Sequence, residues 1–380
     1  MKIPLTRPCA DDAEWKAVRE VLESGWWTQG QRVTQFEESV ARYVGAKAAV
    51  ACSSCTTALH IAMLLMRVQP GDEIIVPSYT WITTANVVRM VGAMPVFADI
   101  DLGTYNLDPA DVERRVTGRT KGIIPVHQFG LPADLDALTE IARRHSLWIV
   151  EDAACALSSA YKGKRIGSHS DIVCFSFHPR KNVSTGEGGI IAINRPDLVP
   201  LARSLISHGA SICDRTKDAA TTVATLMQEE FRIVGYNYRM SDLQAAVGVE
   251  QMKKIDELLA LRAHRAKRYN QLLAEIPGLI TPVVPSDVIF NWQSYVVRLA
   301  ESCPLPMEKV AQYLLDRGVS CRPGYMACHV QPVYRELYPE LALPNTEKAL
   351  SQAIILPSYP QMSDAEQDYV VENLKKALLT

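Results

Sequence analysis

The sequence of 380 residues lacks an excess of charge of either sign, because 40 Lys and Arg stand against 42 Asp and Glu, for a formal net charge of −2. This balance gives no electrostatic reason to expect nucleic acid or an acidic membrane surface as a partner. No apolar run is long enough to cross a bilayer, and no hydrophobic signal segment follows residues 1–5. We therefore expect a soluble, cytoplasmic protein that binds neither nucleic acid nor membrane.

A disulfide framework is also missing, since the nine cysteines are odd in number and scattered, which fits reduced thiols. Cys52 and Cys55 form one C-x-x-C pair, but a second pair at zinc-like spacing is absent, so we predict no metal site. Internal repeats and low-complexity tracts are absent as well. What the chain does have is 48% hydrophobic residues, enough to bury one large core and a second, smaller one.

Short apolar segments of β-type alternate with helical patterns over the first two-thirds of the chain. Predicted strands cover residues 48–51, 73–76, 95–98, 122–126, 147–150, 172–177 and 190–193, and predicted helices cover 57–66, 82–90, 108–116 and 135–145. Such alternation is typical of the α/β class, with a mainly parallel central sheet and helices on both faces.

After residue 240 the pattern changes to a long helix over 241–272, with Ser241 or Asp242 as its cap. A smaller unit follows, with a strand over 294–299 and helices over 307–317 and 364–379. We predict a large domain over 1–240, and the connecting helix with a small C-terminal α+β domain over 241–380. Residues 211–230 form a polar excursion that we expect to be a mobile surface loop with a short helix.

Lys181 lies on a short loop between two apolar strands. Pro179 ends the first strand because it has no N–H to donate, and the glycines at 186, 188 and 189 permit a tight turn before the second. Burial disfavours an ammonium ion and lowers its pKa, so an amine placed here can attack a carbonyl and form a Schiff base. For this residue alone, an ordinary exposed loop lysine is the alternative.

Other polar residues also follow predicted strands, at the edge of the sheet where ligands of parallel α/β proteins bind. Ser54, Cys55 and Thr56 stand just ahead of a helix, where backbone N–H groups and hydroxyls suit a phosphate, although ordinary N-capping is an alternative. Trp81 begins the next helix and offers a flat face for a ring, with core packing as its alternative.

Asp152 ends a further strand, and a carboxylate buried there needs a positive partner such as a protonated pyridine nitrogen. Ser176 adds a hydroxyl toward the same phosphate, and Asn237 is a polar side chain that can reach a neighbouring site. An anion cradle, an aromatic face, an aspartate and a lysine in chain order indicate one cofactor, pyridoxal 5′-phosphate (PLP).

At these residues the sequence resembles the DegT/StrS-type sugar aminotransferases of the fold-type-I PLP superfamily, over nearly the whole chain. The Ser176-Phe-His-x-x-Lys181 motif together with Gly186-Glu-Gly-Gly189 is specific to that family, and residues 24–28, 77–81, 151–154 and 235–244 support it. The resemblance implies Lys181 as the Schiff-base lysine and Asp152 as the partner of the pyridine nitrogen.

The resemblance further implies that Trp81 lies against the ring and that Ser176 joins the Cys55-Thr56 backbone at the phosphate. It implies that Asn237 reaches the phosphate of the other subunit, and hence a homodimer with shared sites, which is also the commonest soluble assembly.

Two positions depart from the family pattern. Cys55 stands where Gly is usual, which is harmless only if φ there is negative. Cys155 stands beside the cofactor's 3-hydroxyl where Gln or His is usual, and a thiol is a poor hydrogen-bond donor. A role for Cys155 as a small packing residue is the alternative. A related sugar dehydratase carries His at the lysine position, so Lys181 argues against that activity.

The function implied by the resemblance is transfer of an amino group from an amino acid, in particular L-glutamate, to a keto or aldehyde sugar. In most members that sugar is nucleotide-linked, whereas a minority aminate an aminocyclitol or free-sugar ketone. Thr28, His178, Arg322 and Tyr325 are expected to line the acceptor pocket, with surface placement as the alternative. A non-transaminating PLP lyase and a regulatory PLP-binding protein also remain open.

Overall fold

The computed structural model describes residues 1–210 and 230–379. The excursion predicted over 211–230 therefore lies outside the described residues, apart from residue 230. Within the described part of the chain, no helix is both long and apolar enough to cross a membrane.

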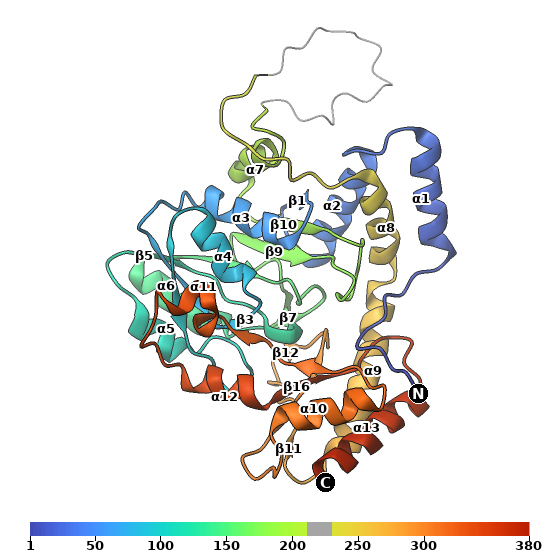
Figure 1. Ribbon diagram of the computed structural model, residues 1–380. Coiled ribbons are helices and arrows are strands. Elements are labelled where there is room, and N and C mark those ends of the chain that lie inside the picture. Colours follow the sequence, from blue (N-terminus) through green and yellow to red (C-terminus); the bar gives the residue numbers. More distant parts are fainter. Residues whose placement is uncertain (211–229, 380) are drawn as a thin grey trace.

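A seven-stranded sheet forms the centre of the molecule (Figure 1). Its strands, in spatial order, are β1 (Ala48–Cys52), β10 (Gly189–Ile193), β9 (Ile172–Ser176), β6 (Trp148–Asp152), β5 (Thr120–Ile123), β2 (Glu73–Pro77) and β4 (Met94–Ala98). The neighbours from β9 to β4 pair in parallel, and only β10 runs antiparallel to both β1 and β9. The predicted α/β class with a mainly parallel sheet is confirmed.

Helices cover both faces of this sheet, and strand β9 shows why its residues are almost all apolar. Ile172 and Cys174 lie in the core formed with α3 (Cys55–Leu65), α4 (Thr83–Met90) and α7 (Val199–Ile206). Val173 and Phe175 point to the opposite face, into the core formed with α2 (Gln31–Val44) and α8 (Asp242–Lys253). Successive residues of a strand face opposite sides, so a strand buried on both must be apolar throughout.

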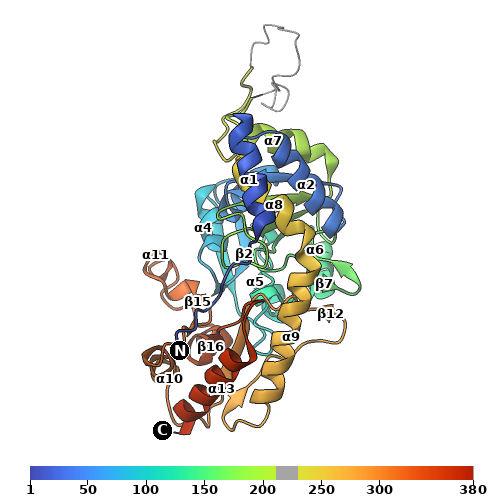
Figure 2. The same ribbon diagram turned by 90° about the vertical axis from the view of Figure 1, so that its right-hand side faces the viewer.

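The predicted single helix over 241–272 is wrong in one respect, because the structure has two helices. Helix α8 ends at Lys253 and α9 (Ile255–Leu273) begins after Lys254, whose φ of −103° and ψ of 0° interrupt the helical backbone. The Lys254 amine is held by Glu14 at 2.7 Å and by Asp11 at 2.7 Å. Figure 2 shows α8 beside α1 (Asp12–Ser24) and α2, whereas α9 continues to the C-terminal helices. The predicted cap Ser241 is confirmed, since its hydroxyl accepts the N–H of Gln244.

A second, four-stranded antiparallel sheet carries the C-terminal part of the chain. Its order is β11 (Leu279–Ile280), β13 (Tyr295–Leu299), β16 (Ala353–Leu356) and β14 (Arg322–Pro323), and it packs with α9, α10 (Met307–Asp316) and α13 (Asp364–Leu379). Ile3 of the N-terminal segment belongs to this second core and pairs with Val319. The division at residue 240 stays a prediction.

The remaining elements include α5 (Pro109–Arg115) and α6 (Leu135–His145), which pack against strands β2, β4 and β5 of the central sheet, and several short elements. The latter are α11 (Pro332–Arg335), α12 (Pro344–Gln352), the strand pair β3 (Tyr79–Thr80) with β15 (Met326–Ala327), the three-stranded sheet β7 (Ala160–Tyr161), β8 (Lys164–Arg165) and β12 (Val288–Ile289), and the 3₁₀ turns at Gln128–Gly130, Pro196–Leu198 and Cys328–Val330. The β3–β15 pair joins the C-terminal part of the chain to the edge of the central sheet.

Asp242 fixes the N-terminus of helix α2 from 212 residues away. Its buried carboxylate accepts the N–H groups of Gly30 at 2.8 Å, Val33 at 3.0 Å and Arg32 at 3.1 Å. Gly30, the N-cap residue, has no side chain that could do this. Burial raises the pKa of Asp242, and the three backbone N–H groups act against that rise.

Replacing Asp242→Ala should lower the free energy of unfolding by about 3 kcal/mol, because it leaves three helix N–H groups without their charged acceptor. Urea denaturation measures this change. The control Glu38→Ala, an exposed position on the same helix, should stay within about 0.5 kcal/mol of the parent. An equally small loss for Asp242→Ala would contradict the capping role.

Candidate active site

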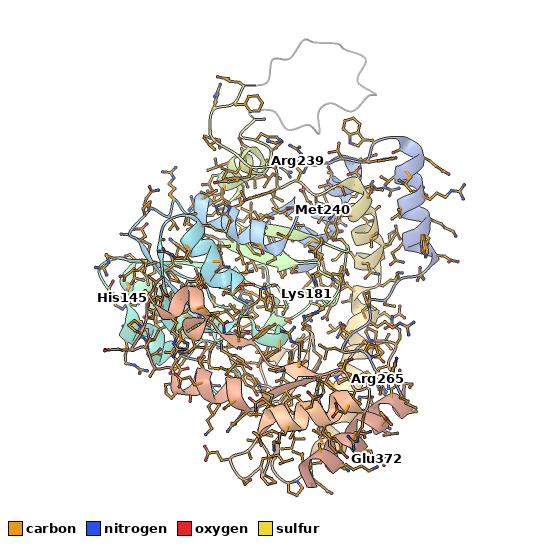
Figure 3. The ribbon with its side chains drawn as sticks, in the orientation of Figure 1. His145, Lys181, Arg239, Met240, Arg265 and Glu372 are labelled. Atoms are coloured by element: carbon orange, nitrogen blue, oxygen red, sulfur yellow. The ribbon has the colours of Figure 1, made fainter. Side chains whose placement is uncertain are left out.

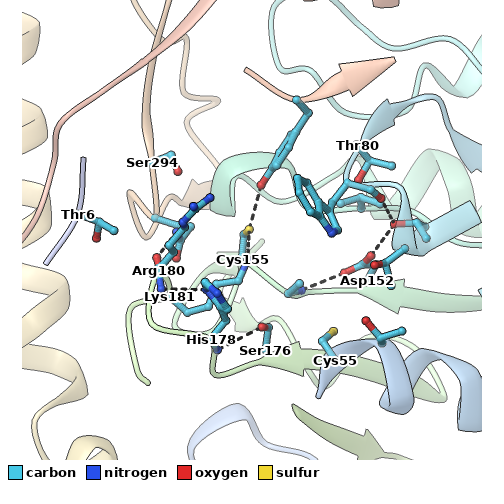
Figure 4. Close-up of a pocket in the computed structure, with 18 of the residues that line it drawn as sticks. Thr6, Cys55, Thr80, Asp152, Cys155, Ser176, His178, Arg180, Lys181 and Ser294 are labelled. Carbon is cyan, nitrogen blue, oxygen red and sulfur yellow. Dashed lines mark hydrogen bonds between the residues drawn. The ribbon is translucent and has the colours of Figure 1, made fainter. Parts of the chain in front are cut away.

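A cleft opens at the carboxyl ends of strands β2, β6 and β9, between the central sheet and the C-terminal part of the chain (Figure 4). Its cavity volume is about 370 Å³. The predicted site residues that line it are Ser54, Cys55, Thr56, Trp81, Asp152, Cys155, Ser176, His178, Lys181, Arg322 and Tyr325. The structure thus brings together all the predicted site residues except Thr28 and Asn237.

Lys181 lies near the centre of the molecule (Figure 3), on the loop between β9 and β10. It is half-buried, and its Nζ donates a hydrogen bond to the Sγ of Cys155 at 3.1 Å. Burial lowers the pKa of this amine, but Cys155, Cys55 and Asp152 raise it by more, so the net direction is upward. The expectation of a lowered pKa is therefore wrong here, because it counted burial and not the acidic groups that other elements bring to the amine.

Asp152 is the last residue of β6 and is only 4% exposed. Its carboxylate accepts hydrogen bonds from the Thr84 hydroxyl at 2.8 Å and from the Ala154 N–H at 3.1 Å, both of them neutral donors. Burial raises the pKa of Asp152 above its usual value in spite of these bonds. A buried carboxylate with a raised pKa is one to which a cation would bind favourably.

The first turn of helix α3 forms the anion cradle of the cleft. Ser54 caps this helix, since its hydroxyl accepts the Thr57 N–H at 3.2 Å, so the capping alternative is confirmed for that side chain. The N–H groups of Cys55 and Thr56 still point out of the helix end, as the first N–H groups of any α-helix do. Cys55 is not among the residues with positive φ, so its departure from the usual Gly causes no strain.

Gly189 allows β10 to approach this cradle closely. A Cβ atom at residue 189 would lie 2.3 Å from the carbonyl carbon of Ser54 and 2.5 Å from the nitrogen of Cys55. The turn before it needs a second glycine for a different reason, because Gly186 has a φ of +82°.

Trp81 and Arg322 occupy the outer part of the cleft. Trp81 is 49% exposed, so the alternative of core packing is wrong. The Arg322 guanidinium lies 5.9 Å from the centre of the Trp81 ring, which is within the range of a cation–π contact. Burial lowers the pKa of Arg322, and so does the nearby charge of Arg180. The pKa of His178 is lowered by burial.

Thr28 and Asn237 lie outside the cleft of their own chain, and both residues are exposed. Asn237 forms an isolated antiparallel bridge with Ser207, and the Thr28 carbonyl accepts the N–H of Asp242 at 3.1 Å.

Sequence reasoning missed three groups at the site. Thr84 holds the carboxylate of Asp152, and its signal was weak because a Thr in the first turn of a helix is common. Arg180 lines the cleft next to Lys181, but it reads as an ordinary loop residue. His127 forms a buried pair with Glu151 at 2.9 Å behind Asp152, and its position after a predicted strand could have indicated it.

These residues fit PLP. Figure 4 shows Lys181 and Asp152 apart from each other in one cleft, where the first could meet an aldehyde and the second a ring nitrogen. The N–H groups at the start of α3, which Gly189 leaves accessible, suit a phosphate. The raised pKa of Asp152 marks a carboxylate that would bind a protonated ring nitrogen. In the part of the chain that the structure describes, no group of three or more His, Cys, Asp or Glu side chains could hold a metal ion.

The raised pKa of Asp152 predicts how the cofactor-free protein depends on pH. The contribution of Asp152 to stability is fully present below its unfolded-state pKa and is lost as pH rises through its higher folded-state pKa. Cofactor-free Asp152→Asn should therefore unfold at a higher temperature than the parent at neutral pH, with a gap that closes in acid. Thermal unfolding at a series of pH values measures this, with the exposed Asp316→Asn as the control. A variant no more stable than the parent at neutral pH would contradict the prediction.

The chain matches the family of DegT/DnrJ/EryC1/StrS aminotransferases over residues 8–375. Spore coat polysaccharide biosynthesis protein SpsC of Bacillus subtilis (strain 168) is 38% identical over 377 residues, which are 98% of this chain and 96% of SpsC. The solved structure of the aminotransferase TlmJ from Streptoalloteichus hindustanus is 32% identical, with a TM-score of 0.91 and 99% of both chains covered.

The PLP form of Spr1654 from Streptococcus pneumoniae is 27% identical, with a TM-score of 0.92, and covers 100% of this chain and 99% of its own. The predicted family, enzyme class and cofactor are confirmed by these findings together. The chain belongs to the DegT/DnrJ/EryC1/StrS aminotransferase family and is a PLP-dependent aminotransferase.

Proposed function

We propose that this aminotransferase moves the amino group of an amino acid, in particular L-glutamate, to a keto or aldehyde sugar that is linked to a nucleotide. The observation that carries the chemistry is that Lys181, Asp152 and the N-terminus of α3 line one cleft, with Lys181 and Asp152 apart from each other. The acceptor class is supported by the name of SpsC, which places that relative in spore coat polysaccharide biosynthesis.

When bound, PLP supplies an aldehyde that exchanges amines and a ring that withdraws electrons. The Lys181 amine would hold the cofactor at that aldehyde, and the same amine, when free, would move the proton at the donor Cα. Asp152 would hold a proton on the ring nitrogen, because its buried carboxylate would gain a positive partner there. The remaining cofactor contacts are assigned to Trp81 at the ring face, Cys155 at the ring edge, and Ser54, Cys55, Thr56 and Ser176 at the phosphate.

Two guanidinium groups support an anionic donor. Arg180 and Arg322 both line the cleft, and in the described part of the chain neither forms an ion pair with a carboxylate. Uncompensated guanidinium groups bind carboxylates in a bidentate manner. Glutamate carries two carboxylates, one of them a single bond from the carbon that reacts, so it can use both arginines. Arg322, His178 and Tyr325 line the same cleft and are assigned to the acceptor side, so Arg322 serves first the donor and then the acceptor.

A second copy of the chain would complete the site. Asn237 is exposed and lies outside its own cleft, so its amide is available to the phosphate held by a partner subunit. We therefore propose a homodimer with shared sites, which is the commonest symmetric assembly. The acceptor role of Thr28 holds only if the partner brings that residue to the cleft.

The direct test mixes the purified yellow protein with L-glutamate. The visible band should disappear, and 2-oxoglutarate should form in an amount equal to the bound cofactor. A lyase or a protein that only binds the cofactor would not form stoichiometric keto acid. The aminated protein is then offered nucleotide-linked keto sugars, free keto sugars and an aminocyclitol ketone, and the products are identified by mass spectrometry. Amination of the last two alone would refute the nucleotide-linked acceptor.

Lys181→Ala should abolish amino transfer and also the adduct that borohydride traps, because the variant has no amine at the reacting aldehyde. Mass spectrometry of the reduced protein detects the adduct. Lys164→Ala, at an exposed lysine of β8, is the matched control and should keep both properties. If borohydride still traps as much cofactor on Lys181→Ala as on the parent, Lys181 has no part in the mechanism.

Asp152→Asn should lower the rate of the half-reaction with glutamate by about 10² or more, which is the loss seen when a charge stabiliser is removed from an active site. Stopped-flow absorption of the loaded protein measures that rate. Since the same variant is expected to stabilise the cofactor-free protein, a slow reaction cannot be ascribed to poor folding. A rate close to that of the parent would overturn the role of Asp152.

A further inference from the structure

Three side chains form a line of contacts along one side of the cleft. The Lys181 amine donates to the Cys155 Sγ at 3.1 Å, and the same sulfur lies 3.2 Å from the Tyr325 hydroxyl. Figure 4 shows these contacts as dashed lines, with Cys155 between the two partners. The Cys155 sulfur therefore contacts both the Tyr325 hydroxyl and the Lys181 amine that reacts.

The position of the Tyr325 hydroxyl is fixed by its surroundings. Its ring stacks on Phe129, with centroids 4.6 Å apart and an angle of 6° between the planes, and meets the ring of Tyr79 edge-on at 6.1 Å. Strand β15, which starts at the next residue, pairs with β3. Phe129 itself is held at a φ of 58°, a conformation that a bulky residue adopts only where its surroundings impose it.

The cleft also determines which side of a bound PLP ring faces Tyr325. If the ring nitrogen lies at Asp152 and the aldehyde at Lys181, two ring carbons flank the ring carbon that bears the aldehyde. These two carbons then lie on opposite sides of the cleft. One of them carries the phosphate arm, and Figure 4 shows the phosphate residues Cys55 and Ser176 below the line from Lys181 to Asp152, with Cys155 on the other side. The other carbon carries the phenolic oxygen, which must then lie on the side of Cys155.

The phenolic oxygen of PLP is negatively charged and needs a hydrogen-bond donor in a buried site. Cys155 offers only a thiol, which is a weak donor. The Tyr325 hydroxyl is a strong donor, and its partner in the structure is that same sulfur, so it loses little by turning to an oxyanion.

We propose that Tyr325 is the residue that donates a hydrogen bond to the phenolic oxygen of bound PLP, and that it thereby sets the pH at which the nitrogen joining Lys181 to the cofactor loses its proton. This inference deepens the proposed function and rests on the attachment of the cofactor to Lys181. It assigns Tyr325 to the cofactor, in addition to its place in the wall of the acceptor cleft.

The direction in which Tyr325 shifts this pH follows from the negative charge of the phenolic oxygen. The phenolic oxygen shares the proton of the neighbouring nitrogen, and its negative charge holds that proton in place. A hydrogen bond from Tyr325 takes up part of this charge, so the proton leaves at a lower pH than it otherwise would. Removing the hydroxyl should therefore shift the proton loss to a higher pH.

The test is a pH titration of the visible absorption of the loaded protein without substrate, for the parent and for Tyr325→Phe. The midpoint of the variant should lie higher by about one pH unit or more, a tenfold change in the proton equilibrium, as expected for loss of a charge-assisted hydrogen bond. Tyr79→Phe removes a hydroxyl from the same aromatic cluster and should leave the midpoint where it is.

Cys155→Ala separates Tyr325 from the sulfur that it contacts. Because the thiol is the weaker donor, this variant should move the midpoint by much less than Tyr325→Phe does. A midpoint that shifts with Cys155→Ala and stays unchanged with Tyr325→Phe would overturn the proposal. Such a result, in a protein that still converts glutamate to 2-oxoglutarate, would leave the proposed function intact, whereas a parent protein without a visible band would refute both.

Discussion

The separation of two groups of opposite charge is the constraint on which this structure depends. Asp152 ends strand β6 and Lys181 lies on the loop that follows the neighbouring strand β9, but the amine bonds to Cys155 and the carboxylate to two neutral donors. Collapse into an ion pair would be favourable in a buried cleft. Instead, the pairing of β6 with β9 fixes where these two strands end, and the loop after β9 carries the amine to Cys155. A flat ring with an aldehyde at one end and a basic nitrogen at the other is what such a gap can accept.

Most of the architecture serves to hold these strand ends still. Strand β9 is apolar on both sides because α3, α4 and α7 cover one face and α2 and α8 cover the other. Asp242 joins the last of these helices to the start of α2, so the covering layer is tied together across the chain. The C-terminal part of the chain closes the cleft through the separate β3–β15 pair, which lies next to Trp81 and Tyr325 in the sequence.

Sequence patterns predicted the strands of the central sheet well, because a strand buried on both faces leaves an apolar run with clear ends. They missed α1, although Asp11 and Glu14 form its capping box, and they missed the break at Lys254, which depends on contacts with α1. The cleft residues at strand ends were predictable, because the carboxyl ends of parallel strands meet at one edge of the sheet. The pKa of Lys181 was not predictable, since its acidic neighbours come from other elements. Sequence alone could not tell that Thr28 would lie apart from the cleft, whereas the resemblance already assigned Asn237 to the site of another subunit.

The contact between Gly189 and the Ser54–Cys55 peptide has a wider consequence. The first turn of α3 rests against a backbone with no side chain, so the depth of that turn in the cleft is decided by a residue that itself holds no ligand. Any larger residue at 189 would push the first turn of α3 away from β10, and with it the N–H groups that bind an anion. Variation among related chains at this spot would thus alter how far the ring sits from Lys181 while every contacting group stays the same.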